Sequence, residues 1–214
     1  MRKKHLLLAA GGHGRVVLNT LLAQGLAVHG ILDPGLVVGQ TIFGVPVLGP
    51  DAWLDNQDPD IFVLANGAGA IPASTLRRRL YEEWTTRGLG FVALCHPSAS
   101  VAREVVLKDG SQIMAGVVIQ PHSQIGVNAV INTQASIDHD CEIGSHAFIA
   151  PGAVLCGGVR VGVGAFVGAG AVLIPGVCVG DEAVVGAGAT VTRDVPPRQR
   201  VMGTPARLSS NIPA

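Results

Sequence analysis

Aliphatic residues recur at every sixth position through the second half of the chain. The series begins at Val101 and ends at Val191, and every member is Val, Ile or Leu. Four residues after each comes Val, Ala, Ser or Cys, which is small enough for a narrow interior. An unbroken period of six is typical of a parallel β-helix, in which three hexads make one triangular coil. The pattern therefore predicts a triangular prism with these residues inside.

The first 94 residues alternate instead between short apolar runs and amphipathic segments. The apolar runs predict strands at residues 5–10, 27–33, 60–66 and 90–95, and the amphipathic segments predict helices at 16–25 and 74–84. Strands that alternate with helices form a parallel sheet with crossover connections. We therefore expect a Rossmann-like α/β domain at 1–95, a parallel β-helix of hexapeptide repeats at 96–200 and a C-terminal tail at 201–214.

Composition and charge narrow the classes of protein that fit. Charged residues make up 14% of the chain, the formal net charge is zero and no basic stripe is present, so we expect no nucleic-acid partner. No stretch approaches the ~20 apolar residues of a membrane span. The apolar run Leu6–Ala10 near the basic start is shorter than the core of a secretory signal peptide. The four cysteines form no CxxC pair, which favours free thiols in a cytoplasmic protein.

The segment IDHDCEIG places three ionisable groups together in a chain with few charges. Within its hexad, Ile137 and Cys141 should point inward, so Asp138, His139 and Asp140 should lie outside at a corner of the prism. A solvated polar corner without a function is the plain interpretation. However, a carboxylate beside an imidazole raises its pKa, and such a histidine can act as a general base near neutral pH.

Three segments together resemble a known family. GGHGRVV near the start, INTQASIDHDCEIG in the repeats and MGTPAR near the end are similar to segments of the hexapeptide-repeat sugar O- and N-acetyltransferases related to sialic-acid O-acetyltransferase, which include the bacillosamine and perosamine N-acetyltransferases. The resemblance covers nearly the whole chain. It implies a left-handed coil, a homotrimer with active sites where two prisms meet, acetyl-CoA as the acetyl donor, and a UDP- or GDP-linked amino sugar as the acceptor.

The resemblance also implies roles for individual residues. In this family the histidine of the H-[DE]-C segment is the general base and the following acid increases its basicity, which corresponds to His139 and Asp140. Asn132 matches a polar residue that lines the acetyl-CoA site. Relatives carry a second, CoA-contacting histidine nine residues after the base. Here Phe148 occupies that position and His146 stands nearby, so both are candidates for the CoA contact.

Spacing adds three further candidates for the acetyl-CoA site. Gly157 follows His139 by three hexads, so it should stack beside it in the next coil, where its N–H could donate to the oxyanion of the reaction. Ala169 and Ala187 are also three hexads apart, and their small side chains would let an extended pantetheine arm approach the backbone. Simple corner packing explains these three residues equally well.

A glycine-rich loop, AGGHG, follows the first predicted strand. Its glycines allow a tight turn, and the helix after it offers N–H groups to a phosphate, although the loop alone is only part of a dinucleotide fingerprint. The resemblance implies that Gly11, Gly12 and His13 bind the nucleotide of the sugar substrate, with Asp33 and Gly67 as further contacts. Bacillosamine-type relatives have a second acid directly after the first, where this chain has proline. An ordinary β-α turn is the alternative interpretation.

We predict an acetyl-CoA-dependent N-acetyltransferase that acts on a nucleotide-linked amino sugar by direct transfer, with His139 as the base and no metal. O-acetylation of a sugar hydroxyl, such as that of a sialic acid, is the runner-up. Two other classes stay open. One is a zinc-dependent, carbonic-anhydrase-like prism, which would use His122, His139 and His146. The other is a non-catalytic scaffold, in which the prism serves as an oligomerisation stalk.

Overall fold

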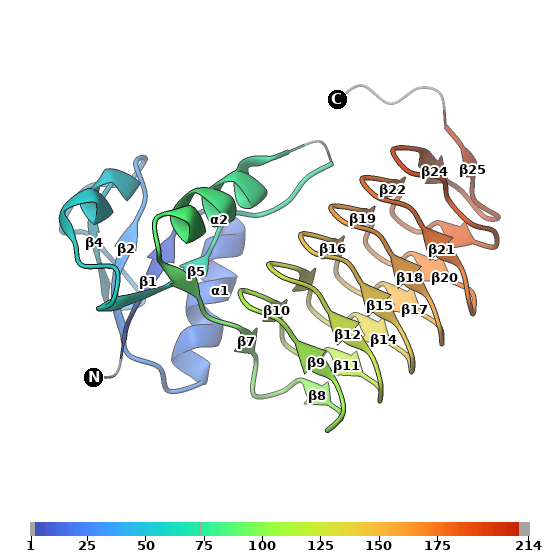
Figure 1. Cartoon of the computed structure of the whole chain (residues 1–214), viewed down its shortest axis with the longest axis horizontal. Coiled ribbons are helices and arrows are strands. Elements are labelled where there is room, and N and C mark those ends of the chain that lie inside the picture. Colours follow the sequence, from blue (N-terminus) through green and yellow to red (C-terminus); the bar gives the residue numbers. More distant parts are fainter. Residues whose placement is uncertain (1–2, 73, 210–214) are drawn as a thin grey trace. The chain divides into compact units, whose positions relative to one another are not determined.

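The computed structural model describes residues 3–72 and 74–209, which divide into two compact units (Figure 1). The first unit holds most of residues 3–97, and the second holds residues 98–209. All four cysteines are free thiols. Among the described residues, no helix has the length and apolar character needed to span a membrane.

The first unit is an α/β fold around a mainly parallel sheet, as the sequence predicts. Its elements are β1 (Lys4–Leu8), α1 (Gly12–Ala23), β2 (Val28–Leu32), β3 (Thr41–Ile42), β4 (Val45–Gly49), the 3-10 helix η1 (Asp51–Asn56), β5 (Phe62–Asn66), α2 (Leu76–Thr86), β6 (Gly90–Phe91) and β7 (Leu94–Cys95). The sheet order is β3-β4-β2-β1-β5-β6, and only the β3–β4 pair in it is antiparallel. The chain therefore builds outward from β1 on one side and then returns to add β5 on the other.

Two parts of this unit differ from the sequence prediction. The expected strand at 90–95 is divided into β6 and β7, because the chain leaves the sheet after Phe91. Strands β3 and β4 and helix η1 are additional. The burial of β4 alternates between buried and half-buried residues, with Pro46 in the middle, and a proline argues against a central strand. Pro46 lies opposite Thr41 of the short edge strand β3, where a missing N–H is tolerated.

The second unit is the predicted parallel β-helix, with three faces built from short strands (Figure 1). Face one contains β8 (Ser100–Val101), β11 (Val118–Ile119), β14 (Ser136–Ile137), β17 (Val154–Leu155), β20 (Val172–Leu173) and β23 (Thr190–Val191). Face two contains β9 (Val106–Leu107), β12 (Gln124–Ile125), β15 (Glu142–Ile143), β18 (Arg160–Val161) and β21 (Cys178–Val179). Face three contains β10 (Gln112–Ile113), β13 (Val130–Ile131), β16 (Phe148–Ile149), β19 (Phe166–Val167), β22 (Val184–Val185), β24 (Arg200–Met202) and β25 (Arg207–Leu208).

The six-residue period sets both the register and the core. Ile137 pairs with Ile119 in the coil before it and with Leu155 in the coil after it, so each coil contains three hexads. From Ile113 to Val191 every aliphatic residue of the series is at most 3% exposed. The series stops where the last coil closes two residues early, since Val195 rather than residue 197 bridges to Val179.

From Gly110 to Gly188, each corner of the prism contains one residue with a positive φ, at the same place in the hexad. Glycine holds this place at eight of these fourteen corners, because it adopts the left-handed conformation without strain. Asp140 holds it with φ of 59°. Aspartate and asparagine tolerate this conformation better than most residues, so the corner geometry restricts which side chains can follow His139.

Candidate functional site

His139 and Asp140 form a hydrogen-bonded pair at the corner between faces one and two, which we call the His139 corner. It comprises residues 120–123, 138–141, 156–159 and 174–177. His139 Nδ1 lies 2.7 Å from Asp140 Oδ2, and the His139 backbone N–H donates to Asp138 Oδ1 at 2.8 Å. The His139 side chain is 60% exposed. Ile137 and Cys141 point inward with no exposed surface, as predicted.

The surroundings of His139 raise its pKa above the ordinary value. The hydrogen bond to Asp140 is the largest cause, and the negative charge of Asp138 adds to it. With Nδ1 engaged by the Asp140 carboxylate, Nε2 is the nitrogen left to accept a proton. His139 is therefore placed to act as a general base, because Asp140 stabilises the imidazolium that forms when the ring takes up a proton.

Gly157 makes room for this imidazole in the next coil. A Cβ built on Gly157 would lie 2.6 Å from both Nε2 and Cε1 of His139, so the ring packs directly over the glycine. The corresponding hexad positions elsewhere hold side chains, such as Ser145, Val163 and Ala169. In the described part of the chain the Gly157 N–H has no hydrogen-bond partner. A donor thus stands free beside the ring, as the oxyanion role requires.

Replacing Asp140 by asparagine should change the pH dependence of acetyl transfer, the activity predicted from the sequence. The specificity constant kcat/KM rises with pH as the general base, His139, loses its proton. Because Asp140 raises the pKa of His139, its loss lowers that pKa, and the acidic limb of the profile moves to lower pH. The plateau should fall about 10-fold, since the base is weaker. Asparagine keeps the left-handed backbone, so the fold is preserved. An acidic limb that stays in place would contradict this coupling.

Asn132, Ala169 and Ala187 lie at a different corner, between faces three and one, which we call the Asn132 corner. It comprises residues 132–135, 150–153, 168–171 and 186–189. Asn132 Oδ1 accepts a hydrogen bond from the Thr133 N–H at 2.8 Å, and the Gly188 N–H donates to the Ala169 carbonyl at 2.8 Å. One chain therefore does not bring these residues to His139. The two corners are the two edges of face one.

The two candidates for a further CoA contact lie on and beside face three. His146 occupies the third corner, where its Nδ1 is 3.0 Å from Nδ2 of the buried Asn128. Since the amide nitrogen donates, Nδ1 of His146 accepts and its proton sits on Nε2. Phe148 stacks on Phe166 with ring centroids 5.4 Å apart and is 7% exposed. Phe148 thus has little surface left for a ligand.

No metal-binding cluster of three His, Cys, Asp or Glu side chains occurs in residues 3–72 and 74–209. His122 lies one coil below the His139–Asp140 pair, and its Nε2 is 3.2 Å from Glu104 Oε2. His122 and His139 are thus each held by an acid, and His146 belongs to another corner. Within one chain, the residues proposed for a zinc site do not converge.

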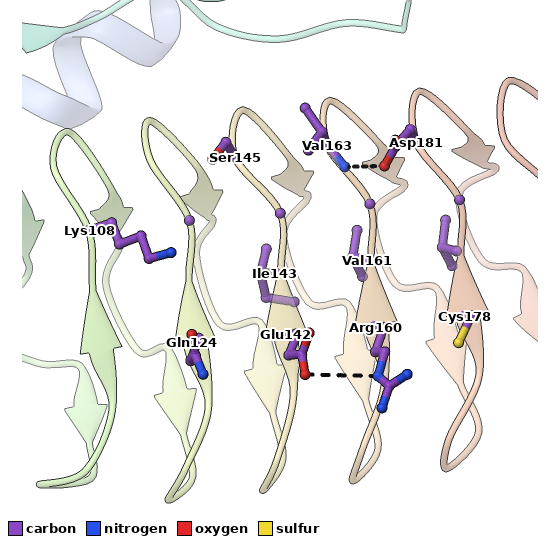
Figure 2. A pocket seen from close by; sticks show the side chains of 15 residues that line it. Lys108, Gln124, Glu142, Ile143, Ser145, Arg160, Val161, Val163, Cys178 and Asp181 are labelled. Atoms are coloured by element: carbon purple, nitrogen blue, oxygen red, sulfur yellow. Dashed lines mark hydrogen bonds and ion pairs between the residues drawn. The ribbon is translucent and has the colours of Figure 1, made fainter.

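A groove of about 460 Å³ runs along face two (Figure 2). Glu142 and Arg160 face each other across neighbouring coils with 3.9 Å between Oε1 and Nε, and Lys108, Gln124 and Cys178 continue the lining. A column of stacked glycines borders the groove, and a Cβ on one of them, Gly144, would lie 2.6 Å from the backbone of the next coil. His139 and Gly157 do not line this groove, so it is separate from the predicted site.

In the first unit, two glycine-rich loops lie next to each other where the strand order of the sheet reverses. The first glycine loop, residues 9–14, follows β1, and the second, residues 67–69, follows β5. The segment after β1 and the segment after β5 leave neighbouring parallel strands at the same edge, and the strand order reverses between them. Ligands of open α/β sheets bind at such a switch point. A Cβ on Gly67 would lie 2.0 Å from the Ala9 carbonyl oxygen, and one on Gly14 would lie 2.1 Å from the same atom. These two glycines are needed for packing.

Gly11 and Gly12 differ from this pair. A Cβ on either would meet nothing within 4 Å, and neither has a positive φ. Both are exposed at the start of α1, whose first turn carries no acidic side chain and no side-chain cap. Free N–H groups at a helix N-terminus favour an anion. Nothing within the described chain requires glycine at these two positions. Close approach of a ligand to the backbone is a reason for glycine here.

The remaining predicted nucleotide contacts lie close to these loops. His13 packs against Gly69, whose Cβ would be 3.3 Å from that of His13. Asp33 lies just after β2, and its carboxylate accepts the Ala10 N–H at 2.7 Å and the Gly35 N–H at 2.8 Å. Asp33 therefore fastens the loop after β1 to the loop after β2. Each of its oxygens retains a lone pair for a ligand.

Comparison with known proteins decides the family. Residues 4–84 match the family described as the PglD N-terminal domain, and residues 158–193 match the hexapeptide repeat of succinyl-transferase. The GDP-perosamine N-acetyltransferase of Escherichia coli O157:H7 is 30% identical over 152 residues, covering 69% of this chain and 67% of the relative. The chain belongs to the family of hexapeptide-repeat sugar N-acetyltransferases. The resemblance inferred from the sequence is thus confirmed, and this N-acetyltransferase family contains a nucleotide-sugar enzyme.

Two solved N-acetyltransferase structures are similar over almost the whole chain. GDP-perosamine N-acetyltransferase from Caulobacter crescentus, a mutant with a histidine replaced by alanine, in complex with CoA and GDP-perosamine, has 38% identity and a TM-score of 0.89, and 97% of each chain is covered. The acetyltransferase domain of PglB from Neisseria gonorrhoeae, in complex with acetyl coenzyme A, has 32% identity and a TM-score of 0.90, with 98% of this chain and 100% of that chain covered.

Proposed function

We propose that this protein is an acetyl-CoA-dependent N-acetyltransferase that acts on a nucleotide-linked amino sugar. The observation that carries the proposal is the His139–Asp140 pair packed over Gly157, in a chain that is similar to a GDP-perosamine N-acetyltransferase crystallised with CoA and GDP-perosamine. The two glycine loops at the switch point supply the nucleotide site that such a substrate needs.

His139 acts as the general base in direct transfer. Its Nε2 takes a proton from the sugar amine as the amine nitrogen attacks the thioester carbonyl, and Asp140 stabilises the imidazolium that results. The Gly157 N–H donates to the oxyanion of the tetrahedral intermediate. The C–S bond then breaks, which yields the N-acetyl sugar and the CoA thiolate, and His139 returns the proton to the sulfur. Cys141 is buried, which argues against an acyl-enzyme.

A homotrimer would complete this site. The outward residues of face one carry no charge, and Val154 and Val172 there are 39% and 36% exposed, whereas face two carries Glu142 and Arg160. Interfaces are depleted of charged side chains at their centre. We place face one toward a three-fold axis, so that the His139 corner of one protomer meets the Asn132 corner of the next. The pantetheine arm would lie along this seam, past Ala169 and Ala187, and His146 has no place in it.

Replacing Gly12 by alanine tests the nucleotide site. Helix propensity favours alanine by about 0.5–1 kcal/mol, so the free energy of unfolding should stay the same or rise slightly. The KM for the nucleotide sugar should rise about 10-fold, because the methyl group holds the phosphate away from the N–H groups of the loop. Gly90→Ala is the matched control, since its Cβ also meets open space. An unchanged KM for Gly12→Ala would place the nucleotide elsewhere.

We also place the protein in the cytoplasm. Its four free cysteines suit a reducing compartment, and nucleotide-linked sugars and acetyl-CoA are soluble substrates.

Thiol release tests the proposed function. The protein is incubated with acetyl-CoA and a panel of UDP- and GDP-linked amino sugars, and the products are analysed by mass spectrometry. We expect CoA release with at least one of them and an acetyl group on the sugar nitrogen. Release with free sialic acid and with no amino sugar would instead establish O-acetylation, the runner-up activity.

A further inference from the structure

Arg77 is a buried cation in the first turn of α2, and the mechanism above does not use it. It is 4% exposed. Its Nη1 donates to the carbonyl oxygens of Asn66, at 2.9 Å, and Ala68, at 3.0 Å. The Asn66 side chain makes two further hydrogen bonds in this region. Its Nδ2 donates to the Arg77 carbonyl at 2.9 Å, and its Oδ1 accepts the Ala68 N–H at 3.2 Å. The loop after β5 is thus fastened to the start of α2.

This arrangement is expensive for folding. Burial lowers the pKa of Arg77 to about 9, so the side chain remains charged at neutral pH while losing its hydration. The positive end of the α2 dipole makes a cation at this position less favourable still. A neutral side chain of similar length would avoid both penalties. Packing alone therefore does not explain why a charged arginine occupies this buried position.

The two carbonyls that Arg77 holds lie on either side of Gly67. Gly67 is in backbone contact with the first glycine loop, since its Cβ would lie 2.9 Å from the Gly14 Cα. Gly69, one residue beyond Ala68, packs on His13. The guanidinium thus lies under the second glycine loop, at the switch point between β1 and β5. In this low-dielectric setting a fixed positive charge acts strongly on a nearby anion.

We propose that Arg77 is a positioning residue for the nucleotide site, which sets the Gly67–Gly69 loop and provides the fixed positive charge facing the diphosphate of the sugar nucleotide. This inference rests on the proposed function. It does not require Arg77 to touch the ligand. It assigns the buried charge to binding of a nucleoside diphosphate group and not to acetyl-CoA, whose proposed site is in the prism.

Calorimetric titration of the full-length protein with GDP and with UDP tests the inference without catalysis. For Arg77→Met we expect the Kd of the nucleoside diphosphate that binds wild type to rise about 10-fold or more, and this loss to shrink as salt is added. Binding of acetyl-CoA should be unchanged. Arg79→Met is the matched control, because it removes an equal charge from an exposed site on the same helix, and its Kd should stay within about twofold of wild type.

Arg77→Lys decides the case if Arg77→Met does not fold, as judged by its melting curve. Lysine keeps the charge and loses the planar guanidinium whose Nη1 donates to both carbonyls, so its Kd should lie between those of wild type and a loss of about 10-fold. Wild-type affinity in a folded Arg77→Met or, failing that, in Arg77→Lys would overturn the inference and leave the proposed function intact. Failure of wild type to bind either nucleotide would instead overturn the nucleotide-linked substrate, and the inference with it.

Discussion

Replacement of His139 by alanine lowers kcat for acetyl transfer about 10²- to 10⁴-fold, the range that a lost general base accounts for. The KM values of both substrates should change little, because the imidazole acts on the proton and does not anchor either substrate. Stability should also change little, since the side chain is 60% exposed. Steady-state kinetics together with thermal melting checks all three expectations.

His122→Ala is the matched control for this variant. His122 is also an exposed corner histidine paired with an acid, one coil away, and its loss should leave kcat within about twofold of wild type. Full activity of His139→Ala would move catalysis elsewhere or support the non-catalytic scaffold.

Replacement of Gly157 by alanine should reduce kcat about 100-fold in a protein that remains folded. The new methyl group would occupy the space of the imidazole, 2.6 Å from Nε2, and would push the ring away from Asp140. A displacement of about 1 Å can cost this factor. The backbone tolerates a side chain at this hexad position, as Ala169 and Val163 demonstrate. The Gly157 N–H is retained, so the loss would report the position of the ring.

NMR titration of His139 provides a second measurement on the same variant. Once the ring leaves Asp140, the largest cause of its raised pKa is lost, and its pKa should fall toward the ordinary value. A wild-type rate with an unchanged pKa would mean that the ring does not depend on Gly157 for its position.

The period of six predicts the prism well, because the six-residue spacing decides both which strands pair across coils and which side chains are buried. Ile137 and Cys141 are inside, and His139 and Gly157 are neighbours across coils, as their spacing of three hexads requires. The same rule separates Asn132 from His139. Seven residues are about one hexad, so Asn132 belongs to the preceding corner. If Asn132 and His139 belong to one site, a single chain cannot complete it, because they lie at two edges of one face.

The first unit is less predictable from the sequence. Strand β4 contains Pro46, which hides it from a search for central strands. The sequence does not single out Arg77, because a charged residue in RRRLYEEW predicts a solvated face. However, the buried residues of α2 follow helical spacing, and they are Arg77, Leu80, Tyr81 and Trp84. The position of Arg77 on this face, and not its charge, therefore indicates that it is buried.

The proposed seam between protomers is tested most directly by mixing two inactive variants. His139→Ala lacks the base, and Ala169→Trp should block the pantetheine arm at the Asn132 corner. If each site joins two protomers, random co-assembly of equal amounts restores about a quarter of the sites, because one seam in four then combines a native His139 corner with a native Asn132 corner. We predict about a quarter of the wild-type rate in the mixture. If the mixture stays as inactive as its parents, each site lies within one chain and the seam is wrong.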